Sequence, residues 1–66
     1  MKNDWSYTMK VLLVEDTKDL NRALKVALEH EGYSVDSAFD GEEATDMIMK
    51  NGYDVVILDI MMPKKT

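Results

Sequence analysis

The sequence predicts an α/β fold in which three parallel strands alternate with two helices. Two short apolar runs, Val11–Val14 and Val55–Leu58, each end at an acidic residue, a pattern typical of strands that are buried on both faces of a parallel sheet. Between the two runs lie two segments with apolar residues at helical spacing. The order strand–helix–strand–helix–strand predicts parallel strands joined by right-handed crossovers.

The first strand is expected over about residues 10–15 and the first helix over about residues 17–31. Asp16 is predicted to cap this helix, with Asp19 as its partner three residues on, as in a capping box. Gly32 is predicted to end the helix because glycine readily takes the left-handed conformation. The apolar stripe expected to face the sheet consists of Leu20, Ala23, Leu24, Ala27 and Leu28.

A second strand is expected over residues 33–38, a second helix over about 41–51 and a third strand over about 53–59. Asp40 and Glu43 have the spacing of a capping box at the start of the second helix. Gly52 is predicted to end it. The apolar stripe of this helix is formed by Ala44, Met47 and Ile48.

A short repeat supports the two helix ends. The sequence Gly-Tyr-Ser-Val at residues 32–35 recurs as Gly-Tyr-Asp-Val at residues 52–55. Each copy is interpreted as a helix stop followed by a strand start. The tyrosines are predicted to pack back on the preceding helix, Tyr33 on Leu28 and Tyr53 on Ile48.

Composition limits the function. The 66 residues carry a formal net charge of −5 and no cysteine, which excludes disulfides and cysteine-ligated zinc and argues against nucleic-acid binding by this segment. No apolar run approaches the ~18 residues of a membrane span, so a cytoplasmic location is expected. We expect residues 1–8 to form a loosely ordered leader and residues 9–66 to form the domain. The alternation of Trp5, Tyr7 and Met9 leaves open a backward extension of the first strand.

Three carboxylates are predicted to meet at one edge of the sheet. Glu15 and Asp16 leave the first strand and Asp59 leaves the third, and the two strands are neighbours if the strand order is 2-1-3. Ligands of open α/β sheets bind outside this carboxyl edge. Because like charges at close range repel each other, a divalent cation would stabilise the cluster. Mg²⁺ favours one or two carboxylates together with waters and phosphate oxygens, so the pattern indicates a Mg²⁺-assisted phosphoryl site. The alternative is that Asp16 only caps a helix and Asp59 only ends a strand in solvent.

The three motifs together resemble the receiver domain of two-component response regulators. They are Lys-Val-Leu-Leu-Val-Glu-Asp at residues 10–16, Asp-Gly-Glu-Glu-Ala at residues 40–44, and Asp-Val-Val-Ile-Leu-Asp-Ile-Met-Met-Pro at residues 54–63. The chemotaxis receiver, a member of this family, has the flavodoxin-like strand order 2-1-3-4-5, so the resemblance implies the order 2-1-3 with one helix on each face. The resemblance covers residues 10 to about 65 and implies a signalling module, with no enzyme activity of its own, whose partner is a sensor histidine kinase.

The resemblance also implies a role for individual residues. Asp59 matches the aspartate that accepts the phosphoryl group, and Asp16 matches the direct Mg²⁺ ligand of the acidic pair. Glu15 matches the partner that acts on the metal through water. Met61 matches the position whose backbone carbonyl binds the metal, and Pro63 matches the proline that shapes the following loop.

Family receivers have five strands, and the sequence stops soon after the third, so it is interpreted as half of a receiver. The switch Ser/Thr, the aromatic switch residue and the phosphate-contacting Lys have no counterpart here, so little switching is expected from the isolated chain. The main alternative is a self-associating half-domain without phosphoacceptor activity. Its interface would be Val55, Val56, Ile57 and Leu58, because a chain this small benefits from a partner and the third strand has an open edge. A flavin or nucleotide binder lacks a glycine-rich phosphate loop, and an aspartate-nucleophile phosphatase would usually have Asp where Met61 stands.

Overall fold

The predicted order of elements is confirmed. A computed structural model of the protein describes residues 7–59. Each element lies within two residues of its predicted ends. The elements are β1 (Lys10–Val14), α1 (Lys18–His30), β2 (Ser34–Ala38), α2 (Gly41–Lys50) and β3 (Val55–Leu58).

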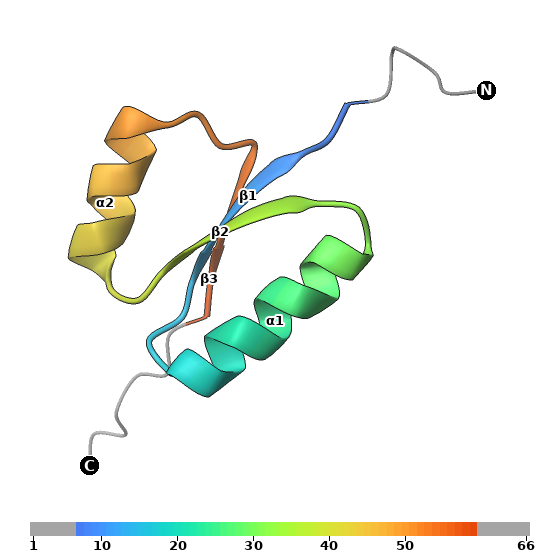
Figure 1. The fold of residues 1–66 in the computed structure, drawn as a ribbon. Helices are drawn as coiled ribbons and strands as arrows, with labels where there is room; N and C mark the ends of the chain where they lie inside the picture. The colour runs from blue at the N-terminus through green and yellow to red at the C-terminus, as the bar shows by residue number, and fades with distance from the viewer. Residues whose placement is uncertain (1–6, 60–66) are drawn as a thin grey trace.

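The sheet has the predicted strand order β2-β1-β3, and both pairings are parallel. Val11 at the start of β1 lies opposite Val35 and Val55, and Val14 at its end lies opposite Ala38 and Leu58. The helices α1 and α2 lie on opposite sides of the sheet (Figure 1). The carboxyl ends of all three strands therefore meet at one edge.

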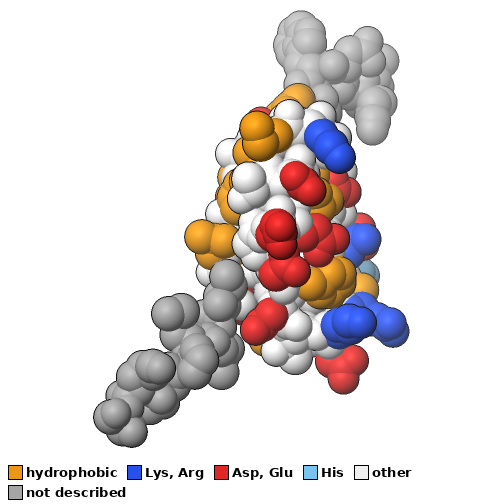
Figure 2. Space-filling model, turned by 90° about the vertical axis from the view of Figure 1, so that its left-hand side faces the viewer, with side chains coloured by type: hydrophobic (Ala, Val, Ile, Leu, Met, Phe, Trp, Pro, Cys, Tyr) orange, Lys and Arg blue, Asp and Glu red, His pale blue; other side chains and the backbone are white. Residues whose placement is uncertain are grey.

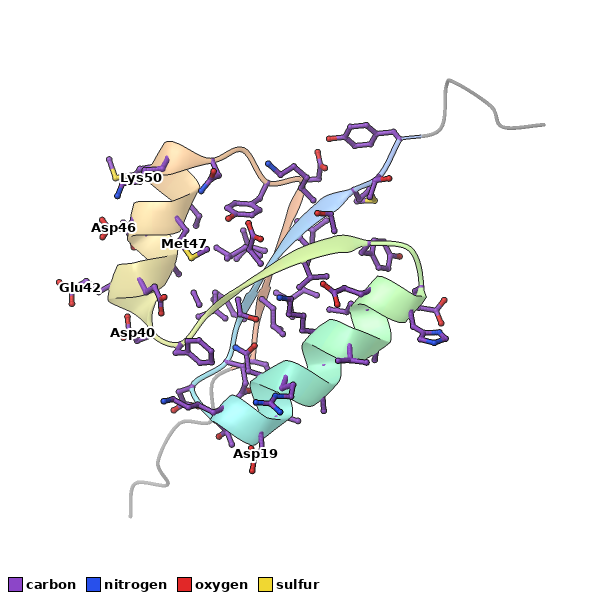
Figure 3. The ribbon with its side chains drawn as sticks, in the orientation of Figure 1. Asp19, Asp40, Glu42, Asp46, Met47 and Lys50 are labelled. Atoms are coloured by element: carbon purple, nitrogen blue, oxygen red, sulfur yellow. The ribbon has the colours of Figure 1, made fainter. Side chains whose placement is uncertain are left out.

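Two small cores flank the sheet because side chains of β1 alternate between its faces. Leu12 and Val14 pack with Ala38 and Ala44 on the α2 side, where Met47 also contacts them. Figure 3 shows Met47 directed from α2 toward the sheet, whereas Glu42 and Asp46 project outward. The α1 side is filled by Val11, Leu13 and Val35, packed against Leu24, Leu28 and Ile57.

The predicted apolar stripe of α1 is only partly correct. Leu24 and Leu28 pack on the sheet, but Ala23 and Ala27 are exposed. The buried residue of this helix is Asn21, which is 1% exposed. The helix is thus rotated about its axis so that Asn21 reaches the backbone of the sheet, where it finds hydrogen-bond partners.

The prediction for the start of α1 is wrong, and that for its end is confirmed. Thr17, not Asp16, occupies the N-cap position, and its side chain makes no capping hydrogen bond. At the other end Gly32 has a φ of 100°. Its N–H donates to the carbonyl of Glu29 (3.0 Å), and the N–H of Tyr33 donates to that of Leu28 (3.2 Å). This pair of bonds is the Schellman motif.

The two ends of α2 also differ in outcome. The capping box is confirmed, because Asp40 Oδ1 accepts from the N–H of Glu43 (2.7 Å) and Glu43 Oε1 accepts from the N–H of Phe39 (2.9 Å). Gly52, predicted to end the helix, does not share the conformation of Gly32, which is the only residue with positive φ among residues 7–59. Asn51 ends α2 in an extended conformation instead.

The Gly-Tyr repeat therefore marks a left-handed glycine at the end of α1 but not at the end of α2. Tyr53 packs against the core cluster of Leu12 and Ala44, while Ile48, its predicted partner, is exposed. The Tyr53 hydroxyl donates to Asp36 Oδ2 at 2.7 Å. Partial burial and this hydrogen bond raise the pKa of Tyr53 to about 12.

The third strand is less buried than the sequence predicts. Its only pairing within residues 7–59 is with β1, so its other edge is open, and Leu58 is 68% exposed. Residues 7–9 form no strand, but the Tyr7 hydroxyl and the Lys10 N–H both donate to Asp54 Oδ2 (2.8 Å each). The Lys10 N–H, and then the tyrosine hydroxyl, lower the pKa of Asp54.

The two remaining predictions concern the N-terminal leader and the absence of a membrane-spanning segment. The leader at residues 1–8 falls largely outside the described residues, and so does the position of Trp5. Within the described part of the chain, no helix has the length and apolar character needed to cross a bilayer.

Candidate functional site at the carboxyl edge of the sheet

The ends of β1 and β3 bring two acidic residues next to each other along the sheet. Val14 pairs with Leu58, and the N–H of Asp59 donates to the carbonyl of Val14 at 2.9 Å. On the other side, the N–H of Glu15 donates to the carbonyl of Ala38 at 3.0 Å. Parallel pairing thus fixes the backbones of Glu15 and Asp59 at adjacent positions on the carboxyl edge.

Glu15 is the most unusual residue of this edge because its side chain is fully buried. Its Oε2 accepts from the backbone N–H of Thr17 at 2.8 Å. Its Oε1 is also buried and has no hydrogen-bond partner. A buried carboxylate oxygen without a partner costs free energy, and a donor or a cation would relieve this cost.

The two aspartates predicted to join Glu15 differ in their exposure to solvent. Asp16 is exposed and Asp59 is partly buried. Among residues 7–59, no three acidic or histidine side chains are arranged closely enough to hold a metal ion. The predicted meeting of all three carboxylates in one cluster is therefore not present, because the Glu15 side chain turns inward to the Thr17 N–H.

The residues at this edge nevertheless fit a hard divalent cation in their chemistry. Mg²⁺ binds through one or two carboxylates and keeps several waters, so Asp16 and Asp59 could hold it directly. The unpartnered Oε1 of Glu15 is suited to accept a hydrogen bond from such a water. Met61 and Pro63, the other residues assigned from the resemblance, lie outside the described residues.

Sequence reasoning missed one residue that organises this edge. Asn21 Nδ2 donates to the carbonyl of Glu15 (3.0 Å) and to that of Ala38 (3.2 Å), and its Oδ1 accepts from the hydroxyl of Ser37. The side chain therefore joins α1 to the ends of β1 and β2. A signal was available, because Asn21 lies three and seven residues before Leu24 and Leu28, the two leucines that pack on the sheet.

Comparison with known proteins defines the class. Residues 11–66 match the family described as the response regulator receiver domain. This match covers most of the chain, and the parallel 2-1-3 sheet with one helix on each face is half of the flavodoxin-like fold of that family. The chain belongs to the response regulator receiver family. Receiver domains are signalling modules of two-component systems.

Curated relatives agree with this assignment. The chain is 47% identical over 58 residues to the transcriptional regulatory protein DltR of Streptococcus agalactiae, an alignment that covers 88% of this chain and 26% of the relative. It is 43% identical over 54 residues to the response regulator ArlR of Staphylococcus aureus, covering 82% of this chain and 25% of the relative. The chain thus spans about a quarter of the length of these relatives.

Proposed function

We propose that the chain is the N-terminal part of a receiver in which Asp59 accepts a phosphoryl group from a sensor histidine kinase. The observation that carries this proposal is the pairing of β1 with β3, which sets Asp59 beside Glu15 at the carboxyl edge. Asp59 is only partly buried, which is compatible with access by a phosphoryl donor. The proposal implies a cytoplasmic location and no nucleic-acid binding by this acidic segment.

The proposed reaction is a single phosphoryl transfer from phosphohistidine to Asp59. A carboxylate oxygen of Asp59 attacks phosphorus, the phosphorus–nitrogen bond of phosphohistidine breaks, and an acyl phosphate forms on Asp59. Asp16, Asp59 and the backbone carbonyl of Met61 would hold Mg²⁺, with Glu15 acting through a water. The metal, when bound, would neutralise charge on the phosphoryl oxygens.

Metal binding is tested first by NMR titration of the 66-residue chain with Mg²⁺. We expect weak, saturable shifts at Asp16 and Asp59 together, and further weakening in Asp16→Asn. Weak binding is expected because losses in the surroundings of a metal site typically cost ~10–100-fold in affinity. Asp46→Asn is the matched control, since Asp46 projects outward from α2 (Figure 3). Saturation that is unchanged by Asp16→Asn would refute the site.

Phosphorylation is tested by incubating the chain with acetyl phosphate and Mg²⁺ and measuring intact mass. We expect at most a small fraction that carries one phosphoryl group, absent in Asp59→Asn and retained in Asp46→Asn. The fraction is small because the family's phosphate-contacting Lys belongs to later elements that these residues do not include, and electrostatic stabilisation is usually the largest catalytic contribution. Rapid, complete modification would contradict this explanation, and modification that survives Asp59→Asn would contradict the phosphoacceptor assignment.

A second candidate function, self-association, is favoured by the open edge of β3. This strand presents unpaired backbone groups, which can pair with a strand of another chain, and Val55 and Val56 are 37% and 40% exposed. Two copies joined at Val55, Val56, Ile57 and Leu58 would form a two-fold dimer with one continuous sheet. Ile57 is the exception in this set, because it packs against the buried cluster of Val11, Leu13 and Val35.

The test is size-exclusion chromatography with light scattering over a range of concentrations. Leu58→Lys is the preferred variant, since Leu58 is largely exposed and its replacement leaves both cores intact. Met49→Lys on α2, also an exposed position, is the matched control. We expect a concentration-dependent dimer that Leu58→Lys abolishes and Met49→Lys preserves. A folded monomer at high concentration would exclude this function.

A further inference from the structure

A pocket of about 290 Å³ lies between α1 and the end of β2. Three of the eight lysines and arginines of the chain contribute to its wall. The residues that line it are Lys18, Asn21, Arg22, Lys25, Ser37 and Phe39. The chain has a net charge of −5, so a concave surface lined by three cations is suited to an anionic ligand.

The cations share one face of α1. Lys18, Arg22 and Lys25 are spaced four and three residues apart, which places them on neighbouring turns of one side of the helix. Within the described part of the chain, Lys18 and Arg22 form no ion pair, and Lys25 has only Glu29 at 4.0 Å. Figure 2 shows cationic side chains gathered at one border of a face dominated by acidic side chains. The positive charge is therefore concentrated rather than neutralised.

The floor of the pocket is held rigidly. Asn21 uses both hydrogens of its amide on the carbonyls of Glu15 and Ala38, and Ser37 donates to its oxygen. The backbone of Phe39 is fixed by its N–H bond to Glu43. Because the hydrogens of Asn21 and Ser37 are already used, the three cationic side chains are the donors left for a ligand. The partly buried ring of Phe39 adds an apolar wall.

We propose that this pocket binds a compact phosphate-bearing small molecule, with the phosphate on the cations and an apolar or planar group against Phe39. Arginine binds phosphate through two parallel hydrogen bonds, and lysine adds point charge. The pocket has a volume near the lower end of small-molecule sites. A compact ligand is favoured over an extended acidic peptide, because Asp40, Glu42 and Glu43 follow Phe39 directly and would repel further negative charge.

The proposal is tested by NMR titration of the 66-residue chain without divalent cations, which keeps it separate from phosphorylation at Asp59. The probes are adenosine monophosphate, inorganic phosphate and adenosine. We expect saturable shifts in residues 18–25 and 37–39 with the nucleotide, weaker shifts at the same residues with inorganic phosphate, and none with adenosine. Equal binding of both phosphates would assign the site to the phosphate alone and overturn the role of Phe39.

Two variants distinguish binding in this pocket from nonspecific electrostatic attraction. Each of them removes one positive charge. Arg22→Gln should weaken nucleotide binding about tenfold or more, the usual effect of losing a hydrogen bond to a charged group. Lys50→Gln, on α2 and outside the pocket (Figure 3), should change it less than twofold. Equal weakening in both variants, or shifts spread over the whole chain, would overturn the proposal. Binding in Asp59→Asn should match that of the unmodified chain.

Discussion

Replacing Asp40 with alanine removes the side-chain cap of α2 and tests how much of the fold rests on local hydrogen bonds. Asp40 Oδ1 accepts from the N–H of Glu43 at 2.7 Å. Loss of such a cap typically costs ~1 kcal/mol, and loss of a negative charge at a helix N-terminus adds ~0.3–1 kcal/mol. We therefore expect the free energy of unfolding to fall by about 1.5 kcal/mol. For a domain of this size, that lowers the melting temperature by roughly 6–12 °C.

The assay is thermal and urea unfolding followed by far-ultraviolet circular dichroism. Thr17→Ala is the matched control, because Thr17 holds the N-cap position of α1 without a side-chain capping bond, and its loss should stay within ~0.5 kcal/mol. Glu43→Ala completes a double-mutant cycle with Asp40→Ala, and the two changes should be less than additive because each breaks the same capping box. Equal destabilisation by Asp40→Ala and Thr17→Ala would refute the reasoning.

Three further predictions follow from particular residues. Gly32→Ala should lower the free energy of unfolding by ~1–2 kcal/mol because φ is 100° there. This cost is conformational, since nothing lies within 4 Å of an added Cβ. Gly41→Ala, in an ordinary helical conformation, should cost nothing in the same urea titration. Asn21→Ala should cost ~2–3 kcal/mol because it leaves two carbonyls at the sheet end without their donor, and a change below 0.5 kcal/mol would contradict that network. The hydrogen bond from Tyr53 to Asp36 stabilises the fold fully below the unfolded tyrosine pKa of 10.0 and is lost as pH rises toward about 12; unfolding midpoints measured against pH should show this loss in the unmodified chain and not in Tyr53→Phe.

The features that the sequence predicts correctly depend on local chemistry. The capping box at Asp40 and Glu43 needs only the spacing of two side chains, and the end of α1 needs only a glycine after an amphipathic segment. Each of these features is specified within about ten residues of sequence, so it can be found without knowledge of the packing.

The features that the sequence does not predict depend on what packs against each element. Gly52 stands where Gly32 stands in the repeat, yet α2 ends at Asn51 in an extended conformation, and Tyr53 packs against the core cluster that includes Leu12 and Ala44. The burial of Asn21 follows from carbonyls on two strands that only the assembled sheet brings within reach. The exposure of Val56 and Leu58 likewise reflects the absence of a second neighbour for β3 within residues 7–59.

Glu15 shows how the stability of this fold and its proposed chemistry oppose each other at one residue. It continues β1, whose residues Val11–Val14 are the most completely buried in the sheet, and the same packing encloses its carboxylate. One oxygen of that carboxylate is compensated by the N–H of Thr17, but the other has no partner, at a cost of ~1–3 kcal/mol. This group lies beside Asp59 on the carboxyl edge, and in the proposed Mg²⁺ site a water on the cation would compensate its second oxygen.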